Sequence, residues 1–154
     1  MTDIGDTIPP VALTRPDDSP VSAADFADQV WVLYFYPKDD TTGCTKQAQE
    51  FSALIAEFDA AGVAVLGVSK DPPKKHVKFT EKYGLTVPLA SDSETDGLAE
   101  AMGVWVEKSM YGKKYMGMER STFLVGKDGK VARVWRKMKV AGHAAEVLDA
   151  AKAL

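Results

Sequence analysis

The sequence contains only one cysteine, Cys44, and only two histidines in 154 residues. A single cysteine excludes an internal disulfide and the Cys-x-x-Cys pair of a dithiol oxidoreductase. The histidines, His76 and His143, lie far apart and match no cysteine/histidine metal spacing, so we expect both at the surface and no bound metal. Any cysteine chemistry in this chain therefore begins from one thiol.

Long apolar runs and an excess of basic residues are also missing. No stretch approaches the roughly 20 apolar residues of a membrane helix. The N-terminal segment "MTDIGDTIPPVALTRPDD" lacks the basic start and apolar run of a signal peptide. The net charge is -3 at pH 7, so the chain has no excess of basic residues with which to bind the phosphate backbone of a nucleic acid. We therefore expect a cytoplasmic protein that binds neither nucleic acid nor membrane.

Apolar segments that alternate between strand and helix character predict an α/β fold in one domain, residues 1–154. Residues 30–36, "VWVLYFY", form a continuous β-branched and aromatic run, typical of a strand that is covered on both faces. Apolar residues at helical spacing follow as far as Gly62, which is placed to end a helix. Residues 63–69 form the next strand, so Cys44 lies at the carboxyl end of the first strand of a βαβ unit, where such sheets bind ligands.

The rest of the chain extends this pattern. Asp71 is placed to cap a helix that ends at Gly84, and residues 87–91 form a short strand. Residues 105–119 read as a polar, aromatic loop whose Trp105, Tyr111, Tyr115 and Met116 we expect to cover the core. "RSTFLVG" and "VARVWRKM" flank the Asp-Gly turn of a hairpin, and residues 142–154 form a last helix. The order of elements is compatible with a thioredoxin-like fold, a mixed central sheet flanked by helices.

Cys44 stands at or just before a helix N-terminus, in "YPKDDTTGCTKQAQE". Unpaired N–H groups and the helix dipole favour a thiolate there. Gly43 permits close backbone approach, so the N–H groups of Gly43 and Cys44 form a candidate anion cradle. The competing interpretation is a small buried hydrophobe, the commonest role of a lone cysteine. Position favours the reactive interpretation.

A high thiolate fraction alone does not explain why a catalytic cysteine reacts rapidly. For cysteines in general, a pKa lowered from about 8.5 to about 6 raises the ionised fraction roughly thirtyfold. The accompanying loss of nucleophilicity costs roughly tenfold. Most acceleration must therefore come from groups that position the substrate and stabilise the leaving oxygen.

Pro37, Thr41 and Cys44 form the pattern Pro-x-x-x-Thr-x-x-Cys after an apolar strand. This resembles the active-site motif of the peroxiredoxins. "YFYPKDDTTGCT", "EKYG", "MYGKKYMGMERSTFLVGKDGKV", "VWRK" and "GHAAEVL" are similar to the bacterioferritin comigratory protein, or peroxiredoxin Q, subfamily. The likeness covers nearly the whole chain.

The resemblance implies a thiol peroxidase that reduces hydrogen peroxide or alkyl hydroperoxides through a Cys44 sulfenic acid, without a cofactor. Thr41 matches the threonine that hydrogen-bonds the peroxide, Pro37 the proline that shields the site, and Arg120 the arginine that favours the thiolate and orients the peroxide. If the resemblance is set aside, the ordinary interpretation of Arg120 is a solvated charge at the edge of a strand, and that of Thr41 is a helix cap or turn residue. Glu119 is a candidate ion-pair partner of its neighbour.

The sequence departs from the subfamily at Gln49. Many members carry a resolving cysteine there, and others carry one on the following helix, where this chain has none. The comparison implies a one-cysteine cycle in which an external thiol such as thioredoxin, glutaredoxin or glutathione resolves the sulfenic acid. It also implies a monomer.

Two other functions stay open at this point. A peroxide sensor would pass the oxidation of Cys44 to a partner protein as one dominant mixed disulfide. A non-catalytic thioredoxin-like interaction module would bury Cys44 and leave it inert.

Overall fold

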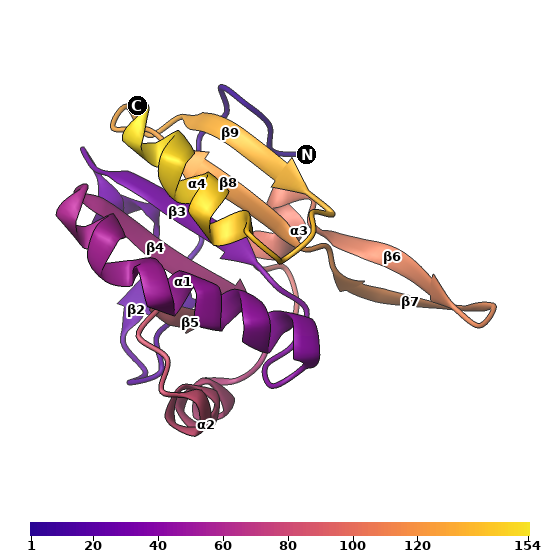
Figure 1. Cartoon of the computed structure of the whole chain (residues 1–154). Coiled ribbons are helices and arrows are strands. Elements are labelled where there is room, and N and C mark those ends of the chain that lie inside the picture. Colours follow the sequence, from indigo (N-terminus) through magenta and orange to yellow (C-terminus); the bar gives the residue numbers. More distant parts are fainter.

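The computed structural model describes residues 1–154 and contains a seven-stranded mixed sheet (Figure 1). β3 runs parallel to β4 and β4 parallel to β5, whereas the other pairings are antiparallel. This confirms the expected mixed central sheet. In spatial order its strands are β2 (Pro20–Val21), β1 (Leu13–Thr14), β5 (Leu89–Ser91), β4 (Val63–Ser69), β3 (Val30–Phe35), β8 (Ser121–Val125) and β9 (Val131–Arg136).

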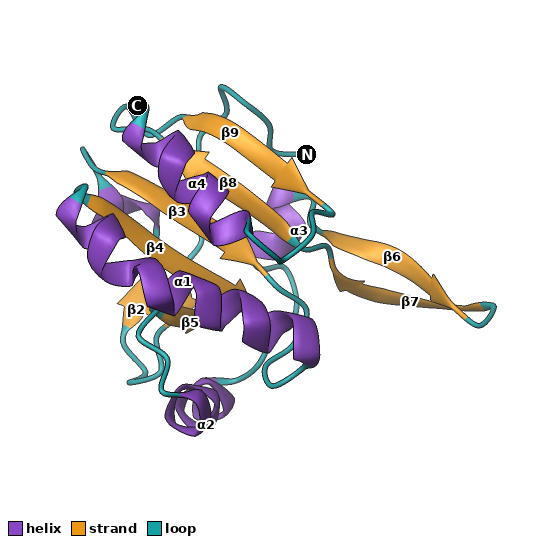
Figure 2. Ribbon diagram, in the orientation of Figure 1, coloured by secondary structure: helices purple, strands orange, loops and turns teal.

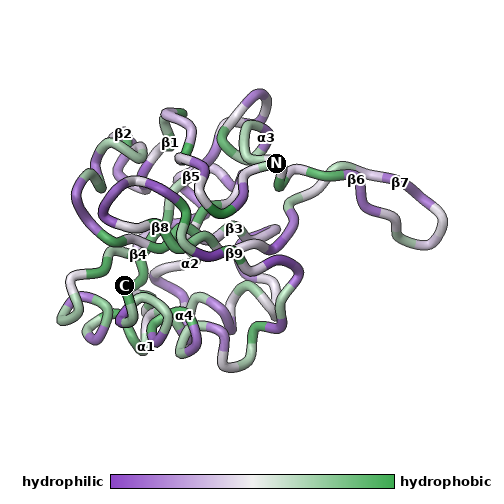
Figure 3. Tube along the Cα trace, turned by 90° about the horizontal axis from the view of Figure 1, so that it is seen from above, coloured by the Kyte–Doolittle hydropathy of each residue, from purple (hydrophilic) through white to green (hydrophobic).

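Helices cover both faces of the sheet (Figure 2). The four α-helices are α1 (Thr42–Ala60), α2 (Pro73–Tyr83), α3 (Leu98–Met102) and α4 (His143–Lys152), and a 3-10 helix, η1, spans Ala23–Phe26. Seen from above, α1 and α4 lie side by side on one face, and α3 lies on the other with the N-terminal segment (Figure 3). α2 packs beside β5. No helix has the length and apolar character needed to cross a membrane.

β3 divides the hydrophobic core into two clusters because its side chains alternate between the faces. Val32 and Tyr34 belong to the cluster under α1 and α4, and Leu33 and Phe35 belong to the cluster under α3. All residues of β3 are buried. The prediction of a central strand covered on both faces is therefore confirmed, and Cys44 lies in the α1 cluster.

Most predicted elements are present, with small shifts at their ends. Gly84 caps α2 in the left-handed conformation, and β8 and β9 form the predicted hairpin. The predicted cap Asp71 is wrong, because Pro72 precedes α2. The Asp71 carboxylate instead accepts hydrogen bonds from the Ser69 hydroxyl and the Asp39 N–H. It thereby anchors the segment that leads to Cys44.

The predicted loop at residues 105–119 is wrong. It is a hairpin of β6 (Trp105–Met110) and β7 (Lys113–Met118) that projects from the body of the domain (Figure 1). Tyr111 and Gly112 both have positive φ and form its turn, as two-residue hairpin turns require. Tyr111 is 98% exposed, so the hairpin tip does not cover the core.

The expected surface position of the histidines is also wrong. His76 is fully buried on α2, where Nδ1 lies 2.6 Å from Asp39 Oδ2 and Nε2 lies 3.1 Å from the Ala90 carbonyl oxygen. The Tyr36 hydroxyl donates to the other Asp39 oxygen at 2.5 Å. This buried network ties the segment after β3 to α2 and β5. His143 is buried at the start of α4, with Nε2 2.9 Å from the Thr122 hydroxyl.

We predict that His76→Ala lowers the free energy of unfolding by about 3 kcal/mol, because it leaves the Asp39 carboxylate and the Ala90 carbonyl buried without their partner. Urea unfolding measures the loss. Lys78→Ala, an exposed position on the same helix, should leave the unfolding curve unchanged. A His76→Ala curve that overlays the wild-type curve would refute the network's structural role.

Stability should fall in mild acid through His143. Burial, the largest cause, lowers the pKa of His143 below 6.5; Glu146 and Glu50 oppose the shift, and Arg120 adds to it. The unfolded chain therefore binds a proton at His143 more readily than the folded chain does. His143 costs the fold no stability above about pH 6.5, and the free energy of unfolding declines as the pH falls below that value. Unfolding measured between about pH 7.5 and 5.5 should show a smaller decline in His143→Gln than in wild type. Equal declines would contradict this assignment.

Candidate active site

Cys44 is the third residue of α1, which confirms its predicted place at a helix N-terminus. Thr41 is the N-cap with extended backbone, and the Thr45 N–H makes the first bond of the helix, to the Thr41 carbonyl at 2.8 Å. The N–H groups of Thr42, Gly43 and Cys44 make no hydrogen bond within the chain. The first turn of α1 therefore presents free donors beside the sulfur.

Arg120 approaches the same turn from the sheet. Phe35 pairs with Ser121, so the residue before β8 lies beside the end of β3. Arg120 Nη2 donates to Cys44 Sγ at 3.2 Å, and Nη1 donates to Gln47 Oε1. Cys44 and Gln47 are three residues apart, so they share a face of α1 that one guanidinium group can span. The side chain of Arg120 is held between two partners.

Gly43 allows this approach. A Cβ atom built at Gly43 would lie 3.3 Å from Arg120 Nη2, closer than most side-chain contacts. The structure thus brings three predicted site residues together: Cys44, Arg120 and Gly43.

Pro37 and Thr41 are both exposed residues of the segment that leads into α1. Pro37 is exposed and lines a pocket together with Arg120. The Thr41 hydroxyl donates to the Lys38 carbonyl at 2.9 Å, and it makes no hydrogen bond to Cys44 or Arg120. Thr41 is therefore the N-cap of the turn that carries Cys44, and its hydroxyl is not hydrogen-bonded to the sulfur.

The surroundings of Cys44 are mostly apolar. Its side chain is only 2% exposed and packs in the apolar cluster of α1. Tyr34 from β3 belongs to the same cluster, and its hydroxyl has no partner. Burial, and next the charge of Cys44, raise the pKa of Tyr34 well above its usual value. The tyrosine stays protonated, and Arg120 is the one charged group that touches the sulfur.

A pocket of about 610 Å³ opens beside Arg120. It lies between the β6–β7 hairpin and the segment after β9. Its lining residues are Pro37, Val106, Glu107, Lys108, Ser109, Tyr115, Glu119, Arg120, Lys137 and Met138. Tyr115 therefore borders the site rather than covering the core.

Gln47 is the residue that sequence reasoning missed. It is almost fully buried, and its side-chain amide oxygen accepts a hydrogen bond from Arg120 Nη1. Its spacing of three residues from Cys44 was the available signal. Glu119 pairs with Arg136 at 3.5 Å rather than with its neighbour Arg120. No group of three or more histidine, cysteine, aspartate or glutamate side chains is arranged to hold a metal ion.

Residues 4–134 match the model of the AhpC/TSA family. Peroxiredoxin Bcp of Xanthomonas campestris is 53% identical over 79% of this chain and 76% of its own length. A structure of the bacterioferritin comigratory protein of Xanthomonas campestris, solved to study its alkyl peroxide reduction, has a TM-score of 0.89 at 43% identity and covers 99% of this chain and 97% of its own.

Two structures of Xanthomonas campestris peroxiredoxin Q carry serine in place of two different cysteines, at 44% and 43% identity and a TM-score of 0.89; they cover 99% of this chain, and 97% and 96% of their own. That relative therefore has at least two cysteines, where this chain has one. The fold, the geometry of the site and the sequence motifs all agree with membership of this family. The chain belongs to the AhpC/TSA family and is a peroxiredoxin of the bacterioferritin comigratory protein or peroxiredoxin Q type, an enzyme that reduces peroxides.

Proposed function

We propose that Cys44 is the peroxidatic cysteine and that external thiols complete its cycle. The contact between Arg120 Nη2 and Cys44 Sγ at 3.2 Å carries this proposal. A guanidinium group at this distance donates a charge-assisted hydrogen bond to the sulfur that attacks the peroxide. The same guanidinium group lines the pocket, whereas the buried sulfur of Cys44 does not, so Arg120 links the pocket to the sulfur.

In the first step the Cys44 thiolate attacks one oxygen of the hydroperoxide. The S–O bond forms while the O–O bond breaks, and the leaving oxygen takes a proton and departs as water or an alcohol. The cysteine is oxidised to a sulfenic acid, and the peroxide is reduced. Negative charge moves from sulfur to the leaving oxygen during this step. Fixed donors near both atoms therefore lower the barrier.

The first turn of α1 supplies those donors in addition to Arg120. The N–H groups of Gly43 and Cys44 are free to donate hydrogen bonds to the oxygen on which negative charge develops. The Thr41 hydroxyl has to exchange the Lys38 carbonyl for the peroxide, which then gains a partner at the helix N-cap. Pro37 stands at the pocket wall and limits the access of water. These residues supply the positioning of the peroxide and the stabilisation of the leaving oxygen that the thiolate alone does not provide.

Resolution needs a thiol from outside, because the chain has no second cysteine and Gln49 stands where many relatives carry one. One thiol condenses with the sulfenic acid, releasing water and forming a mixed disulfide. A second thiol then attacks this disulfide and restores Cys44. Thioredoxin, glutaredoxin and glutathione are reductants of the required class. We place the enzyme in the cytoplasm as a monomer.

We predict that Cys44→Ser abolishes peroxide-dependent oxidation of a thiol reductant. Arg120→Ala should lower kcat/KM for the peroxide about 100-fold, as loss of one preorganised donor does elsewhere. Arg120→Lys keeps the charge but loses the fork that spans Cys44 and Gln47, so it should recover only part of the loss. The measurement is steady-state turnover with hydrogen peroxide and cumene hydroperoxide. Equal activity in wild type and Cys44→Ser would refute the proposal.

The same assay with thioredoxin, glutaredoxin and glutathione as separate reductants identifies the resolving thiol. Poor turnover with all three, together with one dominant protein mixed disulfide at Cys44, would replace the peroxidase cycle with the sensor alternative.

Gln47 should act as a positioning residue. We predict that Gln47→Leu lowers kcat/KM for the peroxide about tenfold, because Arg120 loses the neutral acceptor that orients it. The kcat/KM for the thiol should change little, since the thiol reacts after the peroxide has left. Gln49→Leu is the matched control, the same substitution at an exposed position of the same helix. Indistinguishable peroxide kinetics in the two variants would contradict this role.

A further inference from the structure

The charges around the pocket beside Arg120 are unevenly paired. Both lining acids have partners that do not line it: Glu107 pairs with Lys114 at 3.5 Å, and Glu119 pairs with Arg136 at 3.5 Å. The three lining cations form no such ion pair. The net charge presented to the pocket is therefore positive, although the whole chain carries -3.

The three lining cations are Lys108, Arg120 and Lys137. No carboxylate lies within ion-pair distance of any of them. The only side chains that Arg120 bonds are neutral Gln47 and the sulfur of Cys44. Three cations at one pocket, whose two acids are paired with residues outside it, form an arrangement that an anionic ligand completes.

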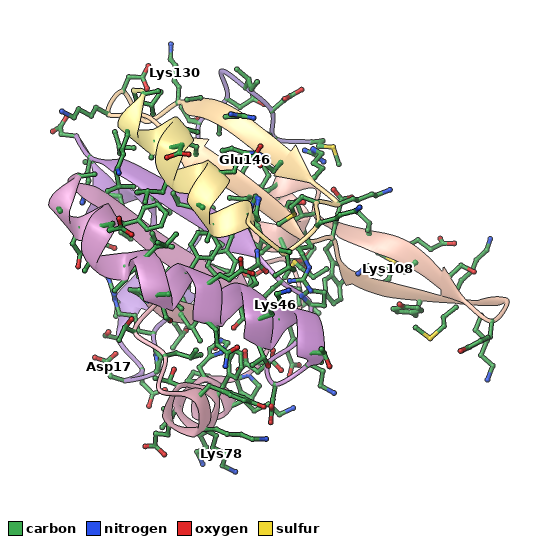
Figure 4. All side chains as sticks on the ribbon, in the orientation of Figure 1. Asp17, Lys46, Lys78, Lys108, Lys130 and Glu146 are labelled. Atoms are coloured by element: carbon green, nitrogen blue, oxygen red, sulfur yellow. The ribbon has the colours of Figure 1, made fainter.

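Lys108 shows this most clearly. It projects from the hairpin (Figure 4) and is half-buried, with its aliphatic chain over Gly117, whose built Cβ would lie 3.1 Å from Lys108 Cδ. Burial, and next the charge of Arg120, lower the pKa of Lys108, while the charges of Cys44 and Glu119 oppose the shift. Lys108 and Arg120 line the same pocket, and glycine at position 117 makes room for the lysine side chain.

The size and remaining lining of the pocket indicate an organic molecule. About 610 Å³ lies within the roughly 300–1,000 Å³ range of small-molecule sites and is about twenty times the volume of one water in the liquid. Val106, Tyr115 and Met138 add apolar surface among the cations. Hydrogen peroxide needs neither the volume nor the apolar wall.

We propose that this pocket binds the carboxylate of an organic molecule that reacts at Cys44, an inference that rests on the proposed role of that cysteine. Lys108 and Lys137 hold the carboxylate, Arg120 marks the path to the sulfur, and the apolar residues contact the carbon chain. Two molecules in the cycle have this chemistry: a hydroperoxide that carries a carboxylate, and a thiol reductant that carries one.

The direct test is the rate of Cys44 alkylation by iodoacetate divided by the rate with iodoacetamide. Both reagents react with the thiolate, so the ratio cancels its ionisation and isolates the carboxylate. We expect Lys108→Gln and Lys137→Gln each to lower the ratio about fivefold, as expected for one partly exposed charge-assisted contact. Lys113→Gln, an exposed lysine of the same hairpin without an ion pair, should leave it unchanged.

Equal ratios in wild type and all three variants would overturn the proposal. The alkylation test does not use peroxide turnover. Wild type without peroxidase activity would refute the proposed function while the ratio still decides whether the pocket selects carboxylates.

Steady-state kinetics then distinguish the two sources. The peroxide arm compares linoleic acid hydroperoxide with its methyl ester, and the thiol arm compares 3-mercaptopropionate with its methyl ester. A preference for the acid that Lys108→Gln and Lys137→Gln remove in one arm assigns the site to that reactant. Absence of such a preference in both arms would contradict the proposal.

Discussion

The contact of the Arg120 guanidinium group with Cys44 and Gln47 is the interaction on which the site depends. It joins the start of β8 to the first turn of α1, two segments that are remote in sequence. The β3–β8 register places Arg120, and the start of α1 after β3 places its two partners. Gly43 leaves the space between them. The sulfur thereby gains a fixed cation inside an otherwise apolar cluster.

The core beneath the site keeps this geometry in place. β3 is buried on both faces, so the point at which the chain leaves the sheet cannot shift without opening two clusters. The segment from Tyr36 to Thr41 is held in turn by the Asp39–His76 pair and by Asp71. A preorganised site of this kind needs little rearrangement when charge moves from sulfur to oxygen.

Local patterns predicted much of the fold. The apolar run at 30–36, the helical spacing after Cys44 and Gly84 at the end of α2 each depend on neighbours in sequence, so periodicity and glycine positions were sufficient. The β6–β7 hairpin was missed because it projects from the domain and leaves the alternation of a half-buried strand incomplete. His76 and His143 were misplaced because their burial depends on Asp39 and Thr122, which only the tertiary fold brings near. Gln47 was missed for the same reason. Its role exists only through Arg120, 73 residues away.

In the proposed cycle Cys44 is oxidised alone and an outside thiol resolves it. The decisive experiment is mass spectrometry, of the intact chain and of its peptides, after one equivalent of hydrogen peroxide with and without a small thiol. We expect addition of one oxygen atom at Cys44 in the absence of thiol, and a mixed disulfide with that thiol in its presence. An unchanged mass, or oxygen added at a methionine while Cys44 stays reduced, would contradict it.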